Sequence, residues 1–327
     1  MENKYNAVVA GAGSIGALKP DEFDSPKSKN ILTLAHAFHN HPKINLVGIV
    51  DVDFEKAMLA GDKWGTIAYE DIKFIPQNID IVTVAIPTER HLSYCLNLPE
   101  ELGYDPKILI IEKPATNFIE HAELIQEKYK NKNTQILVDY IRRYEPIHCM
   151  IREELKNGSF GNILSCRILY TRGLMHEGCH AIDFCNNFFG EYQTGLINGQ
   201  PIIDFREEDP TYSGFMIYEN CPNVVILPCD GRKYSIFDIE IVTDKAIIRF
   251  IDHGLRVRVF KSEPEKTYGN YPSMNYTPWD FPTELDAALY YLVNNAVEVL
   301  EKEKKPLCGI EDAIKVHKIY GYLRGEE

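Results

Sequence analysis

The sequence lacks the features of a membrane or nucleic-acid-binding protein. It contains no uninterrupted apolar run of about 18 residues, the length that a spanning helix needs. We expect no secretion leader, because the strand-like stretch "YNAVVAGAG" begins at residue 5. Lysine and arginine number 35 against 48 acidic residues, and the resulting net charge of −13 repels a phosphate backbone. We therefore expect a cytoplasmic protein that binds neither a membrane nor nucleic acid.

Paired cysteines are also missing. The eight cysteines are scattered and form no C-x-x-C pair, so we expect reduced, mostly buried thiols. The chain has 327 residues, of which 45% are hydrophobic, and is long enough for two domains with a large core.

The first 140 residues alternate short apolar runs with helical patterns. Continuous apolar runs are typical of parallel strands that are covered on both faces. They lie at 5–10, 44–51, 80–87, 107–114 and 135–140. With helical stretches between them, they predict a Rossmann-type, doubly wound α/β domain over residues 1–140.

The second half has a different pattern. From about residue 160, strands with polar alternation and turn residues predict an α+β domain with a large, mostly antiparallel open sheet. We place this domain at 141–308 and expect a C-terminal helix, about 309–325, to pack back on the first domain.

The motif "GAGSIG" has the G-x-G-x-x-G spacing of a dinucleotide-binding turn. Gly11, Gly13 and Gly16, with Ser14 and Ile15 between them, directly follow the first predicted strand, where backbone amides can face a pyrophosphate. Such glycines also join strands to helices for purely steric reasons, and the motif alone leaves both interpretations open.

The second predicted strand ends at Asp51, an acid that can accept hydrogen bonds from the adenosine ribose and would repel a 2′-phosphate. This favours NAD over NADP. From Gly11 to Asp51 is 40 positions (51 − 11), although about 20 is usual. The polar stretch at 19–30 accounts for the excess as an inserted loop, which either borders the active site or is an inert surface excursion.

The stretch "HEGCH", residues 176–180, fits the H-E-x-x-H pattern of zinc peptidases, in which two histidines hold a metal. A third ligand is needed, and the acids further downstream, Glu191 and Asp204, belong to no recognisable zinc-peptidase signature. We therefore expect no metal.

Several motifs together resemble the Gfo/Idh/MocA family of NAD(P)-dependent oxidoreductases. They are "GAGSIG", "IVTVAIPTERH" at 81–91, "IIEKPAT" at 110–116, "VDYIRRYEP" at 138–146 and "GCHAIDF" at 178–184. The resemblance implies an enzyme of carbohydrate metabolism that acts on CH–OH groups of sugars, inositols or nucleotide sugars. It also implies a homo-oligomer, a dimer or tetramer, that forms through the open face of the second sheet.

The resemblance assigns roles on the first domain. Lys113 of the Glu-Lys-Pro motif touches the reacting hydroxyl, and partial desolvation at the strand end would lower its pKa and let it share a proton. Glu112 holds a ribose hydroxyl of the cofactor. Pro87 and Thr88 line the cofactor cleft, and His91 either joins them or simply caps or packs.

On the second domain, the resemblance makes His180 the general base, since an imidazole titrates near neutral pH. The family usually has an aspartate where this chain has His176, so His176 either contacts the substrate or shares charge with His180. Asp183 either orients His180 or is structural.

The substrate contacts are less defined. Arg142, Arg143 and Tyr144 either meet an acidic or hydroxylated substrate or serve packing. The aromatic loop 268–281 suits the apolar face of a sugar or covers an interface.

The leading hypothesis is a dehydrogenase or reductase that transfers a hydride between NAD(H) and a secondary alcohol or ketone. An NAD-dependent glycosidase that acts by transient oxidation and a non-catalytic NAD-binding sensor are the alternatives.

Overall fold

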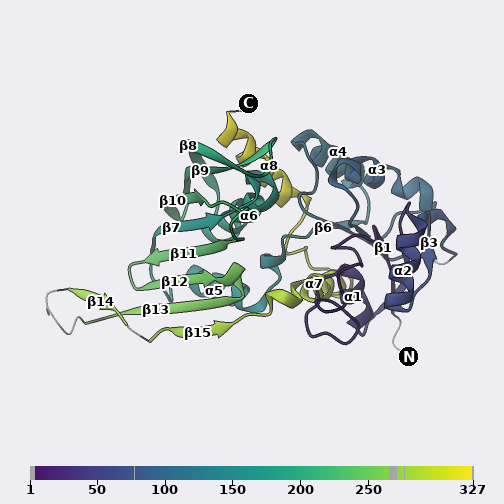
Figure 1. Cartoon of the computed structure of the whole chain (residues 1–327), viewed down its shortest axis with the longest axis horizontal. Coiled ribbons are helices and arrows are strands. Elements are labelled where there is room, and N and C mark those ends of the chain that lie inside the picture. The colour runs from purple at the N-terminus through teal and green to yellow at the C-terminus, as the bar shows by residue number, and fades with distance from the viewer. Residues whose placement is uncertain (1–3, 77, 265–270, 276, 326–327) are drawn as a thin grey trace. The chain divides into compact units, whose positions relative to one another are not determined.

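The computed structural model describes residues 4–76, 78–264, 271–275 and 277–325 (Figure 1). Its chain divides into two compact units, Met1–Tyr144 with Asp286–Lys315, and Glu145–Leu285 with Val316–Glu327. The predicted boundary between domains at residue 140 stays a prediction. None of the described helices is long and apolar enough to cross a membrane.

The first unit is built on a six-stranded parallel sheet with the order β3-β2-β1-β4-β5-β6. Its strands are β1 (Tyr5–Ala10), β2 (Ile44–Val50), β3 (Ala68–Tyr69), β4 (Ile81–Val84), β5 (Ile108–Ile111) and β6 (Gln135–Val138). The strands β4 and β5 are buried along their length, as continuous apolar runs require. This sheet confirms the doubly wound domain that the sequence predicts.

Helices join these strands in the alternation expected of parallel sheets. They are α1 (Leu34–Asn40), α2 (Phe54–Trp64), α3 (His91–Leu102) and α4 (Ile119–Tyr129), and α7 (Ala288–Lys302) also belongs to this unit. Parallel strands place all their carboxyl ends at one edge of the sheet, so the residues after β1, β2, β4, β5 and β6 share that edge.

The second unit contains a nine-stranded sheet with the order β14-β13-β12-β11-β7-β10-β9-β8, and β15 pairs with β13. Its strands are β7 (Ile163–Tyr170), β8 (Tyr192–Arg206), β9 (Asp209–Tyr218), β10 (Cys221–Pro228), β11 (Phe237–Thr243), β12 (Ala246–Ile251), β13 (Arg256–Pro264), β14 (Pro272–Met274) and β15 (Trp279–Pro282). All pairs are antiparallel except β7 with β10, which confirms a large, mostly antiparallel sheet.

Two helices, α5 (Pro146–Lys156) and α6 (Gly178–Phe189), belong to this unit. Three phenylalanines of α6 build an aromatic core on one face of the sheet. Phe184 and Phe188 contact the ring of Phe250 on β12, at centroid distances of 5.2 and 5.8 Å, and Phe189 contacts Tyr218 on β9. This core fixes α6, which contains the candidate His180 and follows His176.

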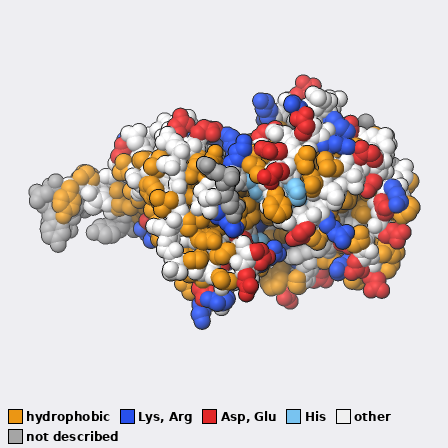
Figure 2. Space-filling view, turned by 90° about the horizontal axis from the view of Figure 1, so that it is seen from above, with side chains coloured by type: hydrophobic (Ala, Val, Ile, Leu, Met, Phe, Trp, Pro, Cys, Tyr) orange, Lys and Arg blue, Asp and Glu red, His pale blue; other side chains and the backbone are white. Residues whose placement is uncertain are grey.

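The opposite face of the large sheet mixes half-buried apolar and charged side chains. Arg167 on β7 and Arg249 on β12 both pair with Glu240 on β11. Figure 2 shows hydrophobic side chains in orange gathered over the strand-rich part of the chain.

The last helix, α8 (Ile310–Arg324), is shared between the units. Its first turns lie with the first unit, where Asp312 pairs with Arg143 at 3.1 Å. Its last turns lie with the second unit, where Tyr322 stacks on Tyr192 of β8 at 6.3 Å. All eight cysteines are free, and six of them are buried.

Candidate functional site

The turn after β1 needs glycine at two positions for steric reasons. Gly11 has φ +103°, and a Cβ there would lie 2.3 Å from the carbonyl oxygen of Ala85. A Cβ on Gly16 would lie 1.8 Å from the carbonyl oxygen of Gly11. At Gly13, by contrast, a Cβ would meet no described atom within 4 Å. Gly13 and the exposed Ser14 therefore present backbone on an open side of a closely packed turn.

The helix that this turn begins is interrupted. Residues 13–17 form a single turn, in which the Ala17 N–H donates to Gly13 O at 2.9 Å. The helix resumes with α1, where the N–H groups of Leu34 and Ala35 donate to the carbonyl oxygens of Ile15 and Gly16, both at 2.9 Å. The predicted insertion is thus looped out after the first helical turn.

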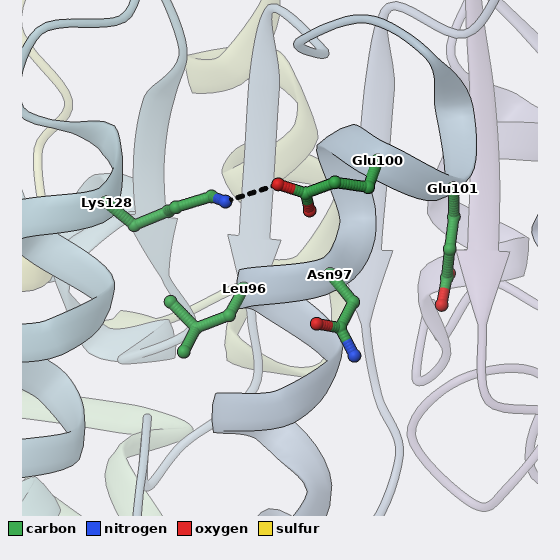
Figure 3. A pocket seen from close by; sticks show the side chains of 5 residues that line it. All are labelled: Leu96, Asn97, Glu100, Glu101 and Lys128. Atoms are coloured by element: carbon green, nitrogen blue, oxygen red, sulfur yellow. Dashed lines mark hydrogen bonds and ion pairs between the residues drawn. The ribbon is translucent and has the colours of Figure 1, made fainter.

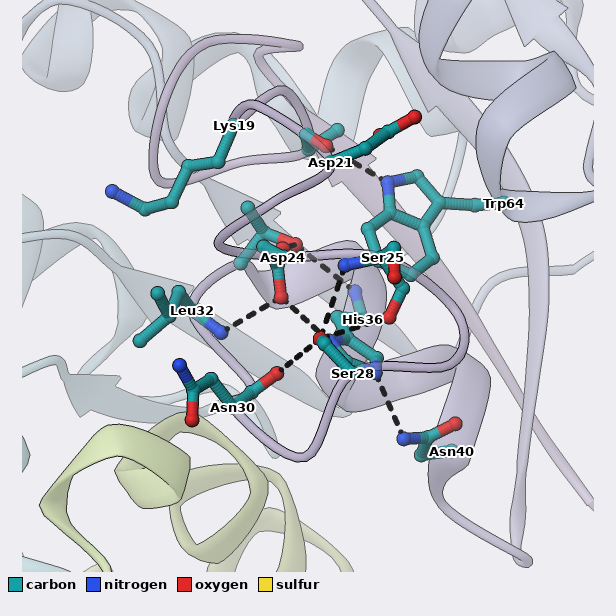
Figure 4. A network of polar contacts seen from close by, with 12 residues as sticks. Lys19, Asp21, Asp24, Ser25, Ser28, Asn30, Leu32, His36, Asn40 and Trp64 are labelled. Atoms are coloured by element: carbon teal, nitrogen blue, oxygen red, sulfur yellow. Dashed lines mark hydrogen bonds and ion pairs between the residues drawn. The ribbon is translucent and has the colours of Figure 1, made fainter.

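A buried polar network holds this insertion (Figure 4). The carboxylate of Asp24 is fully buried and accepts hydrogen bonds from Leu32 N at 3.1 Å and Thr33 Oγ1 at 2.7 Å. Its third partner is His36 Nδ1 at 2.6 Å, and the His36 ring stacks on Trp64 at 4.9 Å. The insertion is therefore held in a defined conformation by buried hydrogen bonds.

The insertion also approaches the glycine turn. Lys19 Nζ donates to Ser14 Oγ at 3.2 Å, and the Lys19 carbonyl oxygen accepts a hydrogen bond from Lys63 Nζ at 2.7 Å. Trp64 Nε1 donates to Ala17 O at 2.8 Å. A cationic side chain thus lies beside the open side of the turn.

The acid at the end of β2 is tied to the same turn. Asp51 Oδ2 accepts a hydrogen bond from Ala12 N at 2.8 Å, and Oδ1 accepts one from Asp53 N at 2.9 Å. The insertion separates Gly11 and Asp51 in sequence but not in space.

These features fit an NAD dinucleotide. The bare backbone at Gly13 allows close approach of a pyrophosphate, and the Asp51 carboxylate is fixed beside it to meet ribose hydroxyls.

The ends of β4 and β5 carry the next predicted residues. Pro87 and Thr88 follow β4, and Thr88 begins a short turn, η2 (Thr88–Arg90). Glu112 and Lys113 directly follow β5 and are half-buried. The backbone N–H of Glu112 donates to Val84 O at 3.1 Å. The ends of β4 and β5 thus bring these four residues to one edge of the sheet.

His91 ties the same two loops together. Its Nδ1 lies 3.0 Å from Ala115 O and its Nε2 lies 2.9 Å from Ile86 O, and the residue is 1% exposed. Burial lowers the pKa of His91, although the two carbonyl groups favour its charged form. This geometry favours the packing alternative, and a cofactor contact by His91 stays a prediction.

The residues after β6 are also well packed. Arg143 is 6% exposed and donates to Leu307 O at 3.2 Å in addition to its ion pair with Asp312. Tyr144 donates its hydroxyl to Val138 O at 2.9 Å. Arg142 is also buried. These contacts favour packing roles, and substrate contact stays a prediction.

In the second unit, "HEGCH" spans a junction between two kinds of helix. His176 lies in a π-helical turn, η4 (Gly173–Glu177), whereas His180 lies in α6. A π turn holds more residues than an α turn, so His176 and His180 do not lie in one continuous α-helix. His180 is 6% exposed, with its ring edge-on to Phe237 at 6.2 Å, and Asp183 is also buried.

Three residues near His176 were missed from the sequence. The Asp209 carboxylate accepts hydrogen bonds from the N–H groups of Met175 and His176, both at 2.8 Å. Phe205 stacks on the His176 ring at 4.4 Å, and the Arg172 guanidinium lies 4.7 Å from the Phe205 centroid. No local motif marks them, because Phe205 and Asp209 reach His176 only through the pairing of β8 with β9.

Two other features lie apart from these residues. Within the described ranges, no group of three or more His, Cys, Asp or Glu side chains is arranged to hold a metal ion. An open pocket of about 520 Å³ lies in the first unit, lined by Leu96, Asn97, Glu100, Glu101 and Lys128 (Figure 3). Lys128 and Glu100 form an ion pair there, at 2.7 Å. None of the five is a candidate site residue.

Comparison with known proteins agrees with this geometry. Residues 6–140 match the Gfo/Idh/MocA family, described as an oxidoreductase family with an NAD-binding Rossmann fold. The match covers 135 of the 327 residues (6–140), and it shows that this part of the chain is similar to the family.

A curated relative is the scyllo-inositol 2-dehydrogenase (NAD(+)) of Bacillus subtilis (strain 168), 25% identical over 166 residues. That match spans 49% of this chain and 43% of the relative, so less than half of the relative's length is covered.

Solved structures share the fold over nearly the whole chain. The WlbA dehydrogenase of Bordetella pertussis, in complex with NADH and UDP-GlcNAcA, is 14% identical with a TM-score of 0.76, over 99% of this chain and 96% of that one. Levoglucosan dehydrogenase, in complex with NADH and levoglucosan, is 16% identical with a TM-score of 0.75, over 99% and 97%.

Proposed function

We propose that this protein is an oxidoreductase that transfers a hydride between NAD(H) and a secondary alcohol or ketone of a sugar, inositol or nucleotide sugar. The observation that carries the proposal is the position of Glu112 and Lys113. They leave β5 at the same sheet edge as the glycine turn that follows β1. The names of the relatives support the carbohydrate-like substrate class.

Two side chains of the protein, Lys113 and His180, handle the proton of the reacting hydroxyl in this proposal. In the oxidation direction, Lys113 donates a hydrogen bond to the reacting oxygen, and the hydroxyl proton passes to a ring nitrogen of His180. His176 contacts the substrate, with its ring orientation fixed by Phe205. Asp209 holds the backbone around His176. Burial raises the pKa of Asp209, and hydrogen bonds from the N–H groups of Met175 and His176 oppose part of this increase.

The first unit holds the cofactor in this proposal. The backbone of residues 11–16 meets the pyrophosphate, and Asp51 accepts hydrogen bonds from the adenosine ribose and repels a 2′-phosphate, which favours NAD over NADP. Glu112 holds a second ribose hydroxyl, and Pro87 and Thr88 line the cofactor cleft.

The remaining assignments concern partners and location. We propose a cytoplasmic homo-oligomer that forms through the open face of the large sheet, where Arg167, Glu240 and Arg249 lie. The aromatic loop 268–281 lies partly outside the described residues.

The test is a screen of the purified protein with NAD and NADP against sugars, sugar acids, inositols and UDP-sugars, followed by NADH absorbance. We expect NADH to form with at least one polyol, and Lys113→Ala to abolish turnover while NAD still binds. Lys107→Ala is the matched control. Lys107 precedes β5, at the opposite end of the strand from Lys113, and pairs with Asp80 at 2.8 Å. Because Lys107 lies away from the proposed site, this change should leave turnover intact.

Other outcomes separate the alternatives. Release of a leaving group without net NADH would indicate the transient-oxidation glycosidase. NAD binding with no change in any substrate would indicate the sensor. A wild-type protein that binds neither nucleotide would overturn the proposal.

A further inference from the structure

A buried carboxylate lies beside Lys113 and has no part in the proposed function so far. Asp139 directly follows β6, and its backbone N–H donates to Ile111 O, the last residue of β5, at 3.0 Å. Ile111 pairs in register with Val138. Glu112, Lys113 and Asp139 therefore leave two adjacent strands at the same edge of the sheet.

The Asp139 carboxylate is poorly satisfied. The residue is 2% exposed, and its Oδ1 has no hydrogen-bond partner among the described residues. Buried polar groups in native proteins are almost always hydrogen-bonded, because an unpaired one costs its full desolvation. A buried carboxylate with one unpaired oxygen, at the edge that carries the candidate site, therefore calls for a functional explanation.

The charges around Asp139 single out one partner. Burial raises the pKa of Asp139 to about 7, and Lys113 opposes this by favouring the ionised carboxylate. Other ionisable side chains lie on the flanking segments. Arg143 is paired with Asp312, and the others include Glu112, Tyr140, Arg142, Tyr144 and Cys308. None of these side chains contributes to the pKa shift of Asp139, so Lys113 is the charged group that affects its pKa.

We propose that Asp139 is a positioning residue for Lys113: its carboxylate, held at the neighbouring strand end, keeps Lys113 in the ammonium form and presents Nζ as a hydrogen-bond donor. This inference rests on the proposed function, in which Lys113 contacts the reacting oxygen. It also separates two roles. Lys113 keeps its proton throughout, and the hydroxyl proton passes to His180 alone.

The test is competitive labelling of lysine amines with acetic anhydride across a pH series, quantified residue by residue by mass spectrometry. Only the unprotonated amine reacts, so the midpoint reports the protonation of each lysine. In Asp139→Asn we expect the Lys113 midpoint to fall by about one pH unit, because an opposite charge is lost. Lys107, at the other end of β5, serves as the internal control and should not move. An unchanged Lys113 midpoint in the folded variant overturns the inference.

The wild type provides a second test that no folding defect can obscure. Ionisation of Asp139 near pH 7 adds a negative charge beside Lys113 and makes its amine harder to deprotonate. Above this pH, the reactivity of Lys113 relative to Lys107 should therefore be lower than a one-group titration curve fitted at lower pH predicts. A single-step curve for Lys113 contradicts the inference. Asp139→Glu should keep the wild-type midpoint, because the charge is retained. None of these measurements needs cofactor or substrate, so their failure is distinct from failure of the proposed function.

Discussion

Two buried carboxylates in the first unit differ in every respect that matters for their roles. Asp24, in the insertion, has three hydrogen-bond donors, whereas Asp139, after β6, has an oxygen with none among the described residues. Burial tends to raise the pKa of Asp24, but hydrogen bonds from His36, Thr33 and Leu32 lower it below its ordinary value. Burial raises the pKa of Asp139. The comparison indicates that the first carboxylate fixes a loop, whereas the second has an oxygen left to interact with a neighbouring group, for which we propose Lys113.

The largest effect should come from breaking the Asp24 network. We expect Asp24→Ala to lower the free energy of unfolding by roughly 3–5 kcal/mol, because Thr33 and His36 lose a buried charged partner. Urea denaturation at neutral pH measures this. The stabilisation by Asp24 is present above its ordinary pKa and is lost as pH falls through the lowered, folded-state value.

Asp21→Ala is the matched control for this network. Asp21 lies three residues earlier and pairs with Lys63 at 2.9 Å, but its side chain is 83% exposed. Its loss should cost less than about 1 kcal/mol. Equal costs for the two alanine variants would remove the distinction between a buried network and surface charge.

Asp139 should behave in the opposite way. Its pKa is raised from 3.8 to about 7 on folding, so its favourable contribution is full below the unfolded value and is lost as pH rises through the folded one. We therefore expect Asp139→Asn to gain stability relative to the wild type between about pH 5 and pH 8, by roughly 2–4 kcal/mol. Thermal unfolding of both proteins across this range measures the gain. If the stability difference between Asp139→Asn and the wild type did not change with pH, ionisation of the Asp139 carboxylate would not destabilise the fold.

The glycine turn offers a change that should affect binding but not folding. Because a Cβ on Gly13 meets no described atom within 4 Å, Gly13→Ala should leave the melting temperature close to that of the wild type. In the proposed function the added methyl group meets the pyrophosphate, and we expect the Kd for NADH to rise by about tenfold or more. Fluorescence titration with NADH measures this.

Gly16→Ala supplies the contrast, since its Cβ would lie 1.8 Å from Gly11 O and should destabilise the fold itself. If Gly13→Ala binds NADH as tightly as the wild type, the pyrophosphate does not lie on this turn.

The smallest effect concerns Lys19, whose Nζ donates a hydrogen bond to Ser14 Oγ. An exposed ammonium near a phosphate is worth less than about 1 kcal/mol, so Lys19→Ala should weaken NADH binding about twofold to fivefold. The effect should shrink as salt is raised. Lys27→Ala, an exposed lysine of the same insertion, should bind NADH as the wild type does. Equal binding by all three proteins would make the insertion irrelevant to the nucleotide.

Much of this fold follows from local sequence patterns. Five of the six parallel strands of the first unit are predicted within a few residues, because strands buried on both faces are continuous apolar runs. The two-residue edge strand β3 is not predicted, and its residues are only half-buried. The strand β8 was missed, since Gly195, Gly199 and Pro201 interrupt its pattern and its pairing with β9 contains register shifts. Only pairing with β9 makes such a stretch a strand.

The site divides in the same way. The insertion at 19–30 was predicted from spacing, but the hydrogen bonds from Leu34 and Ala35 back to the first helical turn are tertiary and leave no sequence pattern. Asp139 was missed although a signal exists, an acid directly after an apolar strand at the carboxyl edge of a parallel sheet. The π turn at His176 has no such signal. The catalytic roles of Lys113, His176 and His180 stay predictions.

The most direct test of the account is a crystal structure of the protein with NADH bound. We expect the adenosine ribose on Asp51, the pyrophosphate on residues 11–16, and Lys113 Nζ and a His180 ring nitrogen both directed at the space over C4 of the nicotinamide ring. A nucleotide bound elsewhere, or Lys113 and His180 directed into different spaces, would contradict it.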